Sequence, residues 1–502
     1  MAAMEEAAGG SAAAAAAEQS VELGGTAEGL SASTNGDSSY GVVATAAATE
    51  HALSSSSKGA VEGPSASHSI WWGTSTFDSW LIAAAAQIGQ VVLTLPYSFS
   101  QMGYAYGLLF LILYGLLGAW TVYILTWLYF EFKSRHSLHG KVYPPRHVLQ
   151  YHEVIGGLTG KWGRCMTFFF VILSLATASV IQLIASASDL YYANDSLNKR
   201  QWEYVVGFFA LISVIVPSFG HFRVGAIVGV SSTTITGLYL FVASLVHGQV
   251  PGVEHVGAVD KVQFFTGATN MLYAFGGHAI TIEIMEATRR PSKFKFVYLA
   301  VVFYTFSVTI PSAVSTYWAF GDILLHRSNA FAVLPPSPWR TFAIVSIVLH
   351  QSMVFVLFVH PVFLVCEKFA KVHTRSLGLR ILVRIPVVLF LWFVALAIPF
   401  FGPIDSVKGA LLVTFAVYII PLVAFFVTYR TKSARQLGKS ASRKKRFRIS
   451  SMVELGPTPM NPYNLLQSPP FVCLFFSSSS LAIRNSRTSD LEVLLVLVFL
   501  AS

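Results

Sequence analysis

Residues 268–285 read ATNMLYAFGGHAITIEIM, and this stretch decides how the rest of the chain is interpreted. It lies where a membrane span is expected, yet it contains the adjacent glycines Gly276 and Gly277, followed by His278 and Glu283. Each glycine weakens a helix by roughly 1 kcal/mol relative to alanine. Irregular backbone inside a bilayer is tolerated only where it is buried in protein or lines a cavity, and ionisable residues there mark binding or proton-handling sites. The stretch therefore predicts the centre of a membrane transporter.

The composition of the whole chain also indicates a membrane protein. Of its 502 residues, 54% are hydrophobic and 12% are charged, whereas a soluble protein carries about 25% charged residues. Apolar runs long enough to cross a hydrocarbon core of about 30 Å recur between Phe77 and Tyr429. We therefore expect an all-α polytopic membrane protein. The three cysteines show neither a disulfide framework nor the spacing of metal ligands, so no metal site is expected.

Three regions of the chain differ in composition. Residues 1–68 are rich in Ala, Ser and Gly with scattered acidic residues, which predicts a disordered cytoplasmic tail because such a segment cannot bury a core. This tail lacks the basic and apolar regions of a secretory signal peptide. Residues 69–436 hold the expected spans and form a transporter core. Residues 437–502 are basic and then rich in Ser, which predicts a second disordered tail.

Hydropathy and helix breakers predict ten membrane-spanning helices in the core. We place them at residues 77–100, 104–132, 165–192, 202–219, 225–247, 262–285, 296–320, 339–366, 383–401 and 408–429. With the N-terminus in the cytoplasm, the cytoplasmic segments hold 25 Lys and Arg residues and the outer segments hold 6, Lys408 among them. This asymmetry satisfies the positive-inside rule. It also explains the net charge of +10, so we expect membrane lipids rather than nucleic acid to face the basic segments.

The first and sixth predicted spans are both interrupted. The first contains Gln87, Gly89 and Gln90 in mid-run, followed by Thr94 and Pro96, whose ring removes a backbone donor. The sixth is the stretch quoted above. Ten spans divide into two sets of five with opposite orientation, and interrupted helices at corresponding positions of two inverted repeats indicate a binding site near the middle of the membrane. The alternative is a pair of kinked helices without a ligand.

Four stretches carry a family resemblance. They are TLPYSFSQMG (94–103), SVIQLIASASDLYY (179–192), FTGATNMLYAFGGHAITIEIM (265–285) and PFFGPIDSVKGALLVTFAVYI (399–419). These stretches resemble the plant auxin influx carriers, a branch of the amino acid/auxin permease family, and the similarity extends from about residue 70 to 436. The resemblance implies a LeuT-type fold, an inverted five-plus-five helix repeat with discontinuous first and sixth spans. It also implies a proton-coupled symporter of indole-3-acetic acid in the plasma membrane, which is not an enzyme and needs no cofactor besides the coupling protons.

The chain departs from the family in three places. Residues 84–86 are alanines where the family commonly has small polar residues, and residues 286–291 are more strongly charged. The similarity stops near Gln436, although the family continues into one more span. The two apolar runs that follow are too short to cross a bilayer. We interpret residues 437–502 as translated intron or an alternative transcript; a genuine short tail is the alternative.

The implied substrate, a flat aromatic ring with a weak carboxylic acid, needs a carboxylate receptor, an apolar slot and a proton partner. The break in the first span is expected to hold the carboxylate through exposed N–H groups and the positive end of a half-helix. Tyr97 and Phe275 are expected to line the slot, with ordinary packing as the alternative. The predicted substrate-binding residues are Gln87, Gln90, Thr94, Tyr97, Gln182, Asn270, Tyr273, Gly276, Gly277 and His278.

His278 is the predicted proton-coupling residue. An imidazole has an unperturbed pKa of about 6.5, between the pH of an acidic cell wall and that of the cytosol. Protonated His278 would pair with the substrate carboxylate and release it on deprotonation; a neutral histidine bonded to the backbone is the alternative. Glu283 either relays the proton or pairs with a basic residue such as Arg289. Lower-ranked polar residues are Gln182, His350 and Gln351 at the cavity wall and Asp78 and Asp189 near the membrane edges.

Two rival functions stay open. A proton-coupled amino-acid permease needs a carboxylate or carbonyl groups for the α-ammonium group of its cargo. No acidic residue lies in the broken part of either span, and Glu283 is the nearest. A receptor that does not transport would bind the ligand without accumulating it. The sequence identifies no protein partner.

Overall fold

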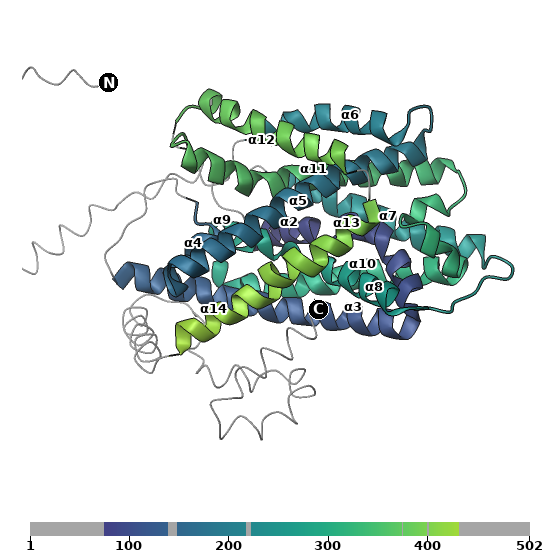
Figure 1. Ribbon diagram of the computed structural model, residues 1–502, viewed down its shortest axis with the longest axis horizontal. Coiled ribbons are helices and arrows are strands. Elements are labelled where there is room, and N and C mark those ends of the chain that lie inside the picture. The colour runs from purple at the N-terminus through teal and green to yellow at the C-terminus, as the bar shows by residue number, and fades with distance from the viewer. Residues whose placement is uncertain (1–74, 139–147, 217–221, 374, 399–400, 431–502) are drawn as a thin grey trace, which may run out of the picture. The chain divides into compact units, whose positions relative to one another are not determined.

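The computed structural model describes residues 75–138, 148–216, 222–373, 375–398 and 401–430. The tails predicted at residues 1–68 and 437–502 lie outside the described residues. Within the described ranges the regular structure is helical and contains no β-strand, so the prediction of an all-α protein is confirmed (Figure 1).

The helices follow the predicted spans. Their bounds are α2 (Thr76–Ile88), α3 (Val91–Leu138), α4 (Tyr151–Thr159), α5 (Lys161–Ala193), α6 (Lys199–Ala210), α7 (Phe222–His247), α8 (Lys261–Tyr273), α9 (Thr281–Ala287), α10 (Phe294–Phe320), α11 (Pro338–Phe369), α12 (Leu377–Ala397), α13 (Phe401–Val407) and α14 (Ile420–Tyr429). Tighter or wider helical turns form η1 (Leu211–Ile215), η3 (Gly277–Ile280), η4 (Pro291–Lys293), η5 (Gly321–His326), η6 (Ala330–Ala332) and the π-helical η7 (Lys408–Ile419). Helix α12 begins before the predicted span at 383–401 because two arginines near its start, Arg380 and Arg384, pair with buried Glu367 instead of facing water.

Seven helical segments in the described part of the chain are long and apolar enough to cross a membrane. They are Val91–Ser137, Lys161–Ala193, Phe222–His247, Pro291–His326, Pro338–Phe369, Leu377–Ala397 and Ile404–Tyr429. The prediction of a polytopic membrane protein is therefore confirmed. The other predicted spans are helical but irregular where the structure describes them, since residues 77–100 break after Ile88, residues 262–285 break after Tyr273, and α6 tightens into η1 after Ala210.

The first break lies between α2 and α3. Helix α2 begins with a capping box, in which Ser75 accepts from the backbone N–H of Asp78 and the Asp78 carboxylate accepts from that of Ser75. It ends at Gly89, whose φ of 38° lies in the left-handed region that favours glycine. A Cβ atom there would also lie 3.3 Å from Nε2 of His350. The chain re-enters helix at Val91, so two residues form the interruption.

The second break lies between α8 and α9. Helix α8 ends at Tyr273, three residues lead into the single 3₁₀ turn of η3, and α9 then continues to Ala287. The two breaks are in contact, because a Cβ atom on Gly277 would lie 2.5 Å from Oε1 of Gln87. Both spans that were expected to be interrupted are therefore interrupted, and a side chain at Gly277 would displace the Gln87 amide.

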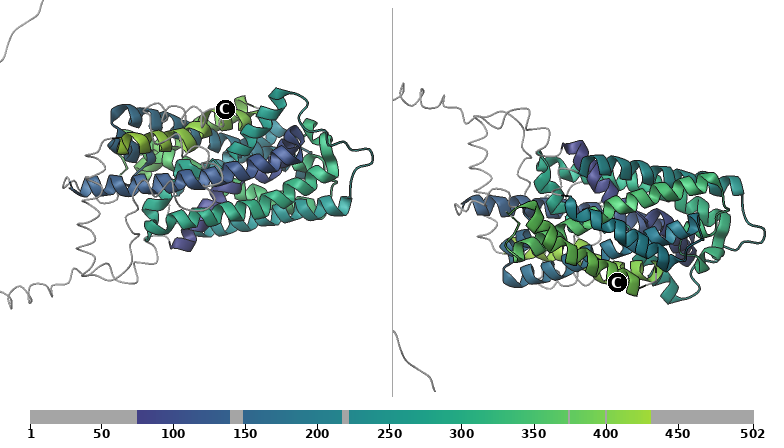
Figure 2. Two further views of the ribbon diagram at one scale, coloured as in Figure 1. Left: turned by 90° about the horizontal axis from the view of Figure 1, so that it is seen from below. Right: turned by 90° about the horizontal axis from the view of Figure 1, so that it is seen from above.

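The long helices pack around these breaks. Helix α5 packs against α11, α3 packs against α8 and α10, and α7 contacts α2, α10 and α11. The views in Figures 1 and 2 show these helices lying side by side. Residues 83–86 of α2 are buried alanines, and their small side chains allow close approach of α7 and α10. The first part of α3, up to a kink at Gly103, is the second half of the first broken span, and it packs beside α8, the first half of the other broken span.

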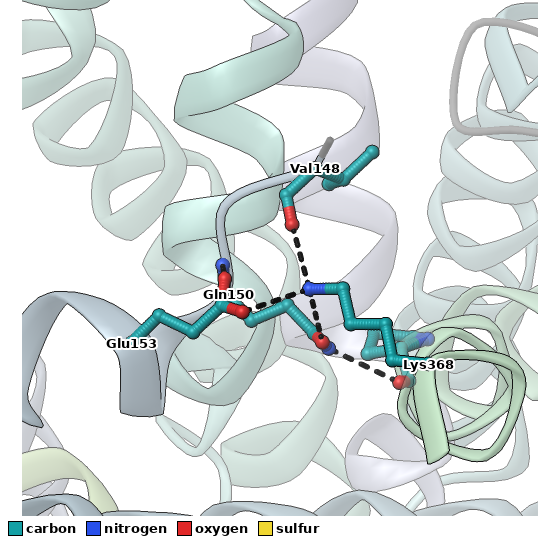
Figure 3. Close-up of polar contacts among 5 residues, drawn as sticks. Val148, Gln150, Glu153 and Lys368 are labelled. Carbon is teal, nitrogen blue, oxygen red and sulfur yellow. Dashed lines mark hydrogen bonds and ion pairs between the residues drawn. The ribbon is translucent and has the colours of Figure 1, made fainter. Parts of the chain in front are cut away.

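The short helix α4 is fixed at its first turn to the C-terminal end of α11. Lys368 donates from Nζ to Val148 O, Gln150 Oε1 and Glu153 Oε1, each at 3.0 Å (Figure 3). The α4–α11 connection is thus made by one ammonium group with three acceptors.

His152 lies in the first turn of α4, and burial lowers the pKa of its imidazole to about 4.

Candidate functional site

A central cavity lies where the two breaks meet. Its volume is about 20 Å³, which is room for about one water molecule, so a larger ligand can enter only if the side chains around the two breaks move apart. The residues that line it are Ala86, Gln87, Ile88, Gly89, Gln90, Val91, Gln182, Tyr273, Gly276, Gly277, Val354, Phe358 and Lys408. Six of the ten predicted binding residues are therefore in the wall of one cavity: Gln87, Gln90, Gln182, Tyr273, Gly276 and Gly277.

Gln87 joins the two breaks. Its Nε2 donates to Ala274 O at 2.6 Å, and its Oε1 accepts from the hydroxyl group of Tyr298 at 2.9 Å. Both ends of this amide are therefore used by the protein. Gln87 holds the walls of the central cavity in position and has little capacity left for a ligand.

Two other amides leave an oxygen unpaired. Gln90 donates from Nε2 to Oδ1 of Asp405 at 3.0 Å, so its Oε1 faces away from that carboxylate. Among the described residues, neither Oε1 of Gln90 nor Oε1 of Gln182 has a hydrogen-bond partner. A buried polar atom without a partner costs about 1–3 kcal/mol. The cavity wall therefore presents two acceptors that a ligand N–H group or water can satisfy.

Lys408 supplies the positive charge of the cavity. Its side chain is 3% exposed, and Nζ lies 4.4 Å from the ring centroid of Tyr273 and 5.7 Å from that of Phe358. No carboxylate of the described residues lies within ion-pairing distance of this Nζ, and Asp405 attracts Lys408 only at longer range. A buried ammonium group is costly unless an anion pairs with it. The cavity is therefore suited to a ligand that carries a carboxylate.

We predicted Lys408 at the outer end of the last span and counted it with the outer segments, whereas the structure places it in the cavity wall. The helical run extends from Phe401 to Tyr429 instead, and π-helical η7 begins at Lys408 itself. No acidic residue lies in the broken part of either span, but Glu283 is not the acidic residue nearest to the breaks, since Asp405 comes from the last span and bonds Gln90. An Asp and a Lys three residues apart at the start of an apolar run are on one helix face, and this spacing was the available signal.

His278 lies one residue behind the cavity wall and is fully buried. Its Nε2 lies 3.0 Å from Gly118 O and 2.8 Å from Oγ1 of Thr121. Because a carbonyl oxygen only accepts, Nε2 carries a hydrogen. Its Nδ1 lies 3.4 Å from the Tyr298 hydroxyl group, which in turn donates to Gln87. A chain of hydrogen-bonding groups thus connects His278 with the central cavity.

The remaining predicted residues lie outside the cavity wall. Thr94 Oγ1 bonds Val91 O, the Tyr97 hydroxyl group accepts from Gln101, Asn270 Oδ1 accepts from Ser406, and Phe275 packs on Phe306. Glu283 is 1% exposed, and its Oε2 has no hydrogen-bond partner in the described ranges. The binding and proton-coupling roles of these residues stay predictions.

The chain is similar in sequence to known transport proteins. Residues 73–448 match the family model described as transmembrane amino acid transporter protein. Auxin transporter protein 1 of Arabidopsis thaliana is 48% identical over 375 residues, which cover 74% of this chain and 77% of that protein. Auxin transporter-like protein 2 of Medicago truncatula is 48% identical over 76% of this chain and 78% of its own length. Auxin transporter-like protein 2 of Oryza sativa subsp. japonica is 48% identical over 73% of this chain and 76% of its own length.

Proposed function

Because the chain belongs to the family of transmembrane amino acid transporters and its relatives at 48% identity are named auxin transporters, we propose that it transports auxin across a membrane. In finer detail, the protein is a symporter that imports indole-3-acetic acid through the plasma membrane together with a proton. The observation that carries this proposal is Lys408, a buried ammonium group in the cavity wall with no carboxylate partner among the described residues.

The chemistry of the central cavity matches each part of this substrate. The carboxylate pairs with Lys408, near the N-terminus of α3, where the helix dipole also favours negative charge. The indole N–H donates to the unpaired Oε1 of Gln90 or Gln182. The flat ring packs against Tyr273 and Phe358. One ligand of this kind satisfies the charge and the unpaired polar atoms of the site together.

His278 carries the coupling proton in this proposal. The hydroxyl hydrogen of Tyr298 is directed to Gln87, so Tyr298 presents its oxygen to Nδ1 of His278. A proton added at Nδ1 therefore meets an acceptor, while Nε2–H keeps Gly118 O. The resulting charge lies one residue behind the cavity and attracts the substrate carboxylate. Buried Glu283, with an oxygen unpaired in the described part of the chain, is the next proton acceptor.

The direction of transport rests on the distribution of basic residues. With the buried residues Lys408 and Arg384 left out, five Lys and Arg residues remain in the outer segments, against 24 in the cytoplasmic segments. This supports a cytoplasmic N-terminus. The contact between breaks of the first and sixth spans supports the LeuT-type inverted repeat. Protons are the coupling ion, and no other cofactor is proposed.

An amino acid is the second candidate cargo. Oδ2 of Asp405 has no hydrogen-bond partner within the described residues, so it can receive an α-ammonium group while Lys408 holds the carboxylate. Neutral amino acids would then displace labelled substrate, and aryl-acetic acids would not. A receptor without transport is distinguished by ligand binding that is not followed by accumulation in vesicles.

Uptake of radiolabelled indole-3-acetic acid by oocytes at external pH 5.5 and 7.5 tests the proposal. We expect uptake above that of water-injected cells, higher at pH 5.5, and we expect His278→Ala to lose the increase at equal surface amount measured by biotinylation. An absence of uptake despite protein at the cell surface would refute the carrier. Uptake by His278→Ala with an unchanged pH dependence would refute the role of His278 alone.

A further inference from the structure

A second buried carboxylate lies away from the central cavity. Asp189 on α5 is completely buried and accepts two hydrogen bonds, from Nδ2 of Asn329 at 2.6 Å and from Nε2 of Gln351 at 2.7 Å. Asn329 belongs to the segment between α10 and α11, where it caps η6, and Gln351 lies on α11. One carboxylate therefore holds together two long helices and the segment that connects α10 to α11.

The orientation of both amides is fixed by other contacts. Oδ1 of Asn329 accepts from the backbone N–H of Phe331 at 2.9 Å, and Oε1 of Gln351 accepts from Oγ of Ser186 at 2.8 Å. Each amide must therefore present its NH₂ group to Asp189. A carboxylate that only accepts satisfies both donors, whereas a protonated carboxyl group places its own O–H against one of them.

Asp189, Ser186 and Gln351, which form a hydrogen-bond network with Asn329, lie on the same two helices, α5 and α11, as part of the cavity wall. Gln182, which lines the cavity, lies one helical turn from Ser186 and two turns, about 10 Å, from Asp189 along α5. On α11, Gln351 is one turn from Val354, which also lines the cavity. If the N-terminus is cytoplasmic, as proposed above, this network lies between the cavity and the outer side of the membrane.

No cation of the described residues lies within ion-pairing distance of Asp189. The charged and titratable groups on neighbouring elements make other contacts, although Nε of Arg340 and Nε2 of His350 have no hydrogen-bond partner among the described residues. Lys199 on α6 lies over the rings of Tyr191 and Tyr192, Arg340 on α11 donates to Phe331 O, and His350 on α11 contacts Gly229 O. Lys199 attracts Asp189 at longer range. The ionised carboxylate is thus stabilised mainly by the two amide donors.

We propose that Asp189 is a second proton-binding site, and that a proton there releases Asn329 and opens the segment between α10 and α11 on the outer side of the cavity. The proposal rests on the proposed import function and adds to His278 a site that controls entry. Loss of one hydrogen bond to a charged group shifts the equilibrium between held and released segment by about tenfold. External acid therefore favours the open entrance.

Asp189→Asn tests the proposal, because an asparagine, like a protonated carboxyl group, offers one acceptor and one donor and does not titrate. We expect the ratio of variant to wild-type uptake to be several-fold above one at pH 7.5 and close to one at pH 5.5. Ser186→Ala is the matched control, since it removes a neighbouring hydrogen bond without a titratable group, and its ratio should be the same at both pH values. A ratio for Asp189→Asn that does not change with pH would overturn the proposal.

A labelling experiment tests the segment independently of transport. Ala330 is 1% exposed and follows Asn329 directly. In full-length chains whose native cysteines are replaced by serine, Ala330→Cys is treated with a membrane-impermeant maleimide on intact cells at pH 7.5. We expect labelling about tenfold faster with Asp189→Asn than with Asp189, and equal rates would overturn the proposal. If wild type shows no uptake but labelling differs, the import function fails and the proton-binding site stands.

Discussion

Replacement of Lys408 by methionine removes the charge of the central cavity and keeps most of the side-chain volume. Lys408 is 3% exposed, so a bound carboxylate beside it is shielded from water. Removing one partner of a buried ion pair costs about 3 kcal/mol, which is about 100-fold in the dissociation constant. We therefore expect Lys408→Met to bind indole-3-acetic acid about 100-fold more weakly. Indole-3-acetamide keeps the ring and the N–H but has no charge, and its affinity should change by less than about threefold.

Calorimetric titration of purified protein at pH 5.5 measures both affinities. The double variant Asp405→Asn/Lys408→Met is the matched control. Asp405 attracts Lys408 in the wild type, so in the single variant Lys408→Met the Asp405 carboxylate would be left beside the cavity without a compensating positive charge. It should show the same loss for the acid with a smaller loss of thermal stability. Lys408→Arg should keep part of the affinity for the acid. A loss that is equal for the acid and the amide, or below about threefold for the acid, would refute the carboxylate–Lys408 pair.

Two further predictions concern the second break and the helix α4. Gly277→Ala should lower uptake about tenfold without loss of surface protein, because its Cβ atom would lie 2.5 Å from Oε1 of Gln87 and displace it from Tyr298; Gly378→Ala, which meets nothing within 4 Å, should be neutral. The pKa of buried His152 is lowered to about 4, so its neutral form stabilises the fold above pH 6.5, and that stability is lost as the pH falls toward 4. The free energy of unfolding of His152→Gln, measured by thermal melting, should therefore decrease less between pH 7 and 5 than that of the wild type. The two decreases should differ by about 1 kcal/mol at pH 5.5, and equal decreases would contradict the buried neutral form.

The positions of the two helix breaks could be predicted from the sequence, but the charged residues that surround them could not. Gly276 and Gly277 in an apolar run, and Gly89 between Gln87 and Gln90, marked both interruptions because glycine inside a membrane helix has a strong structural meaning. Local composition identified these positions without knowledge of the tertiary contacts. The same residues then proved to meet in space.

Lys408 and Asp405 were missed because hydropathy treats a charged residue as the end of a span. Burial by neighbouring helices, which is a tertiary effect, decides instead that both lie inside. Asp189 was expected near the outer face for the same reason. Its amide partners come from positions 140 and 162 residues away, and no local pattern in the sequence indicates them.

A structure with bound indole-3-acetic acid is the direct test of the Lys408 site. We expect the carboxylate within hydrogen-bond distance of Nζ of Lys408 and the indole ring against Tyr273 and Phe358, between the two helix breaks. A ligand bound outside this cavity, or a carboxylate held by other residues while Lys408 pairs with Asp405, would contradict this expectation.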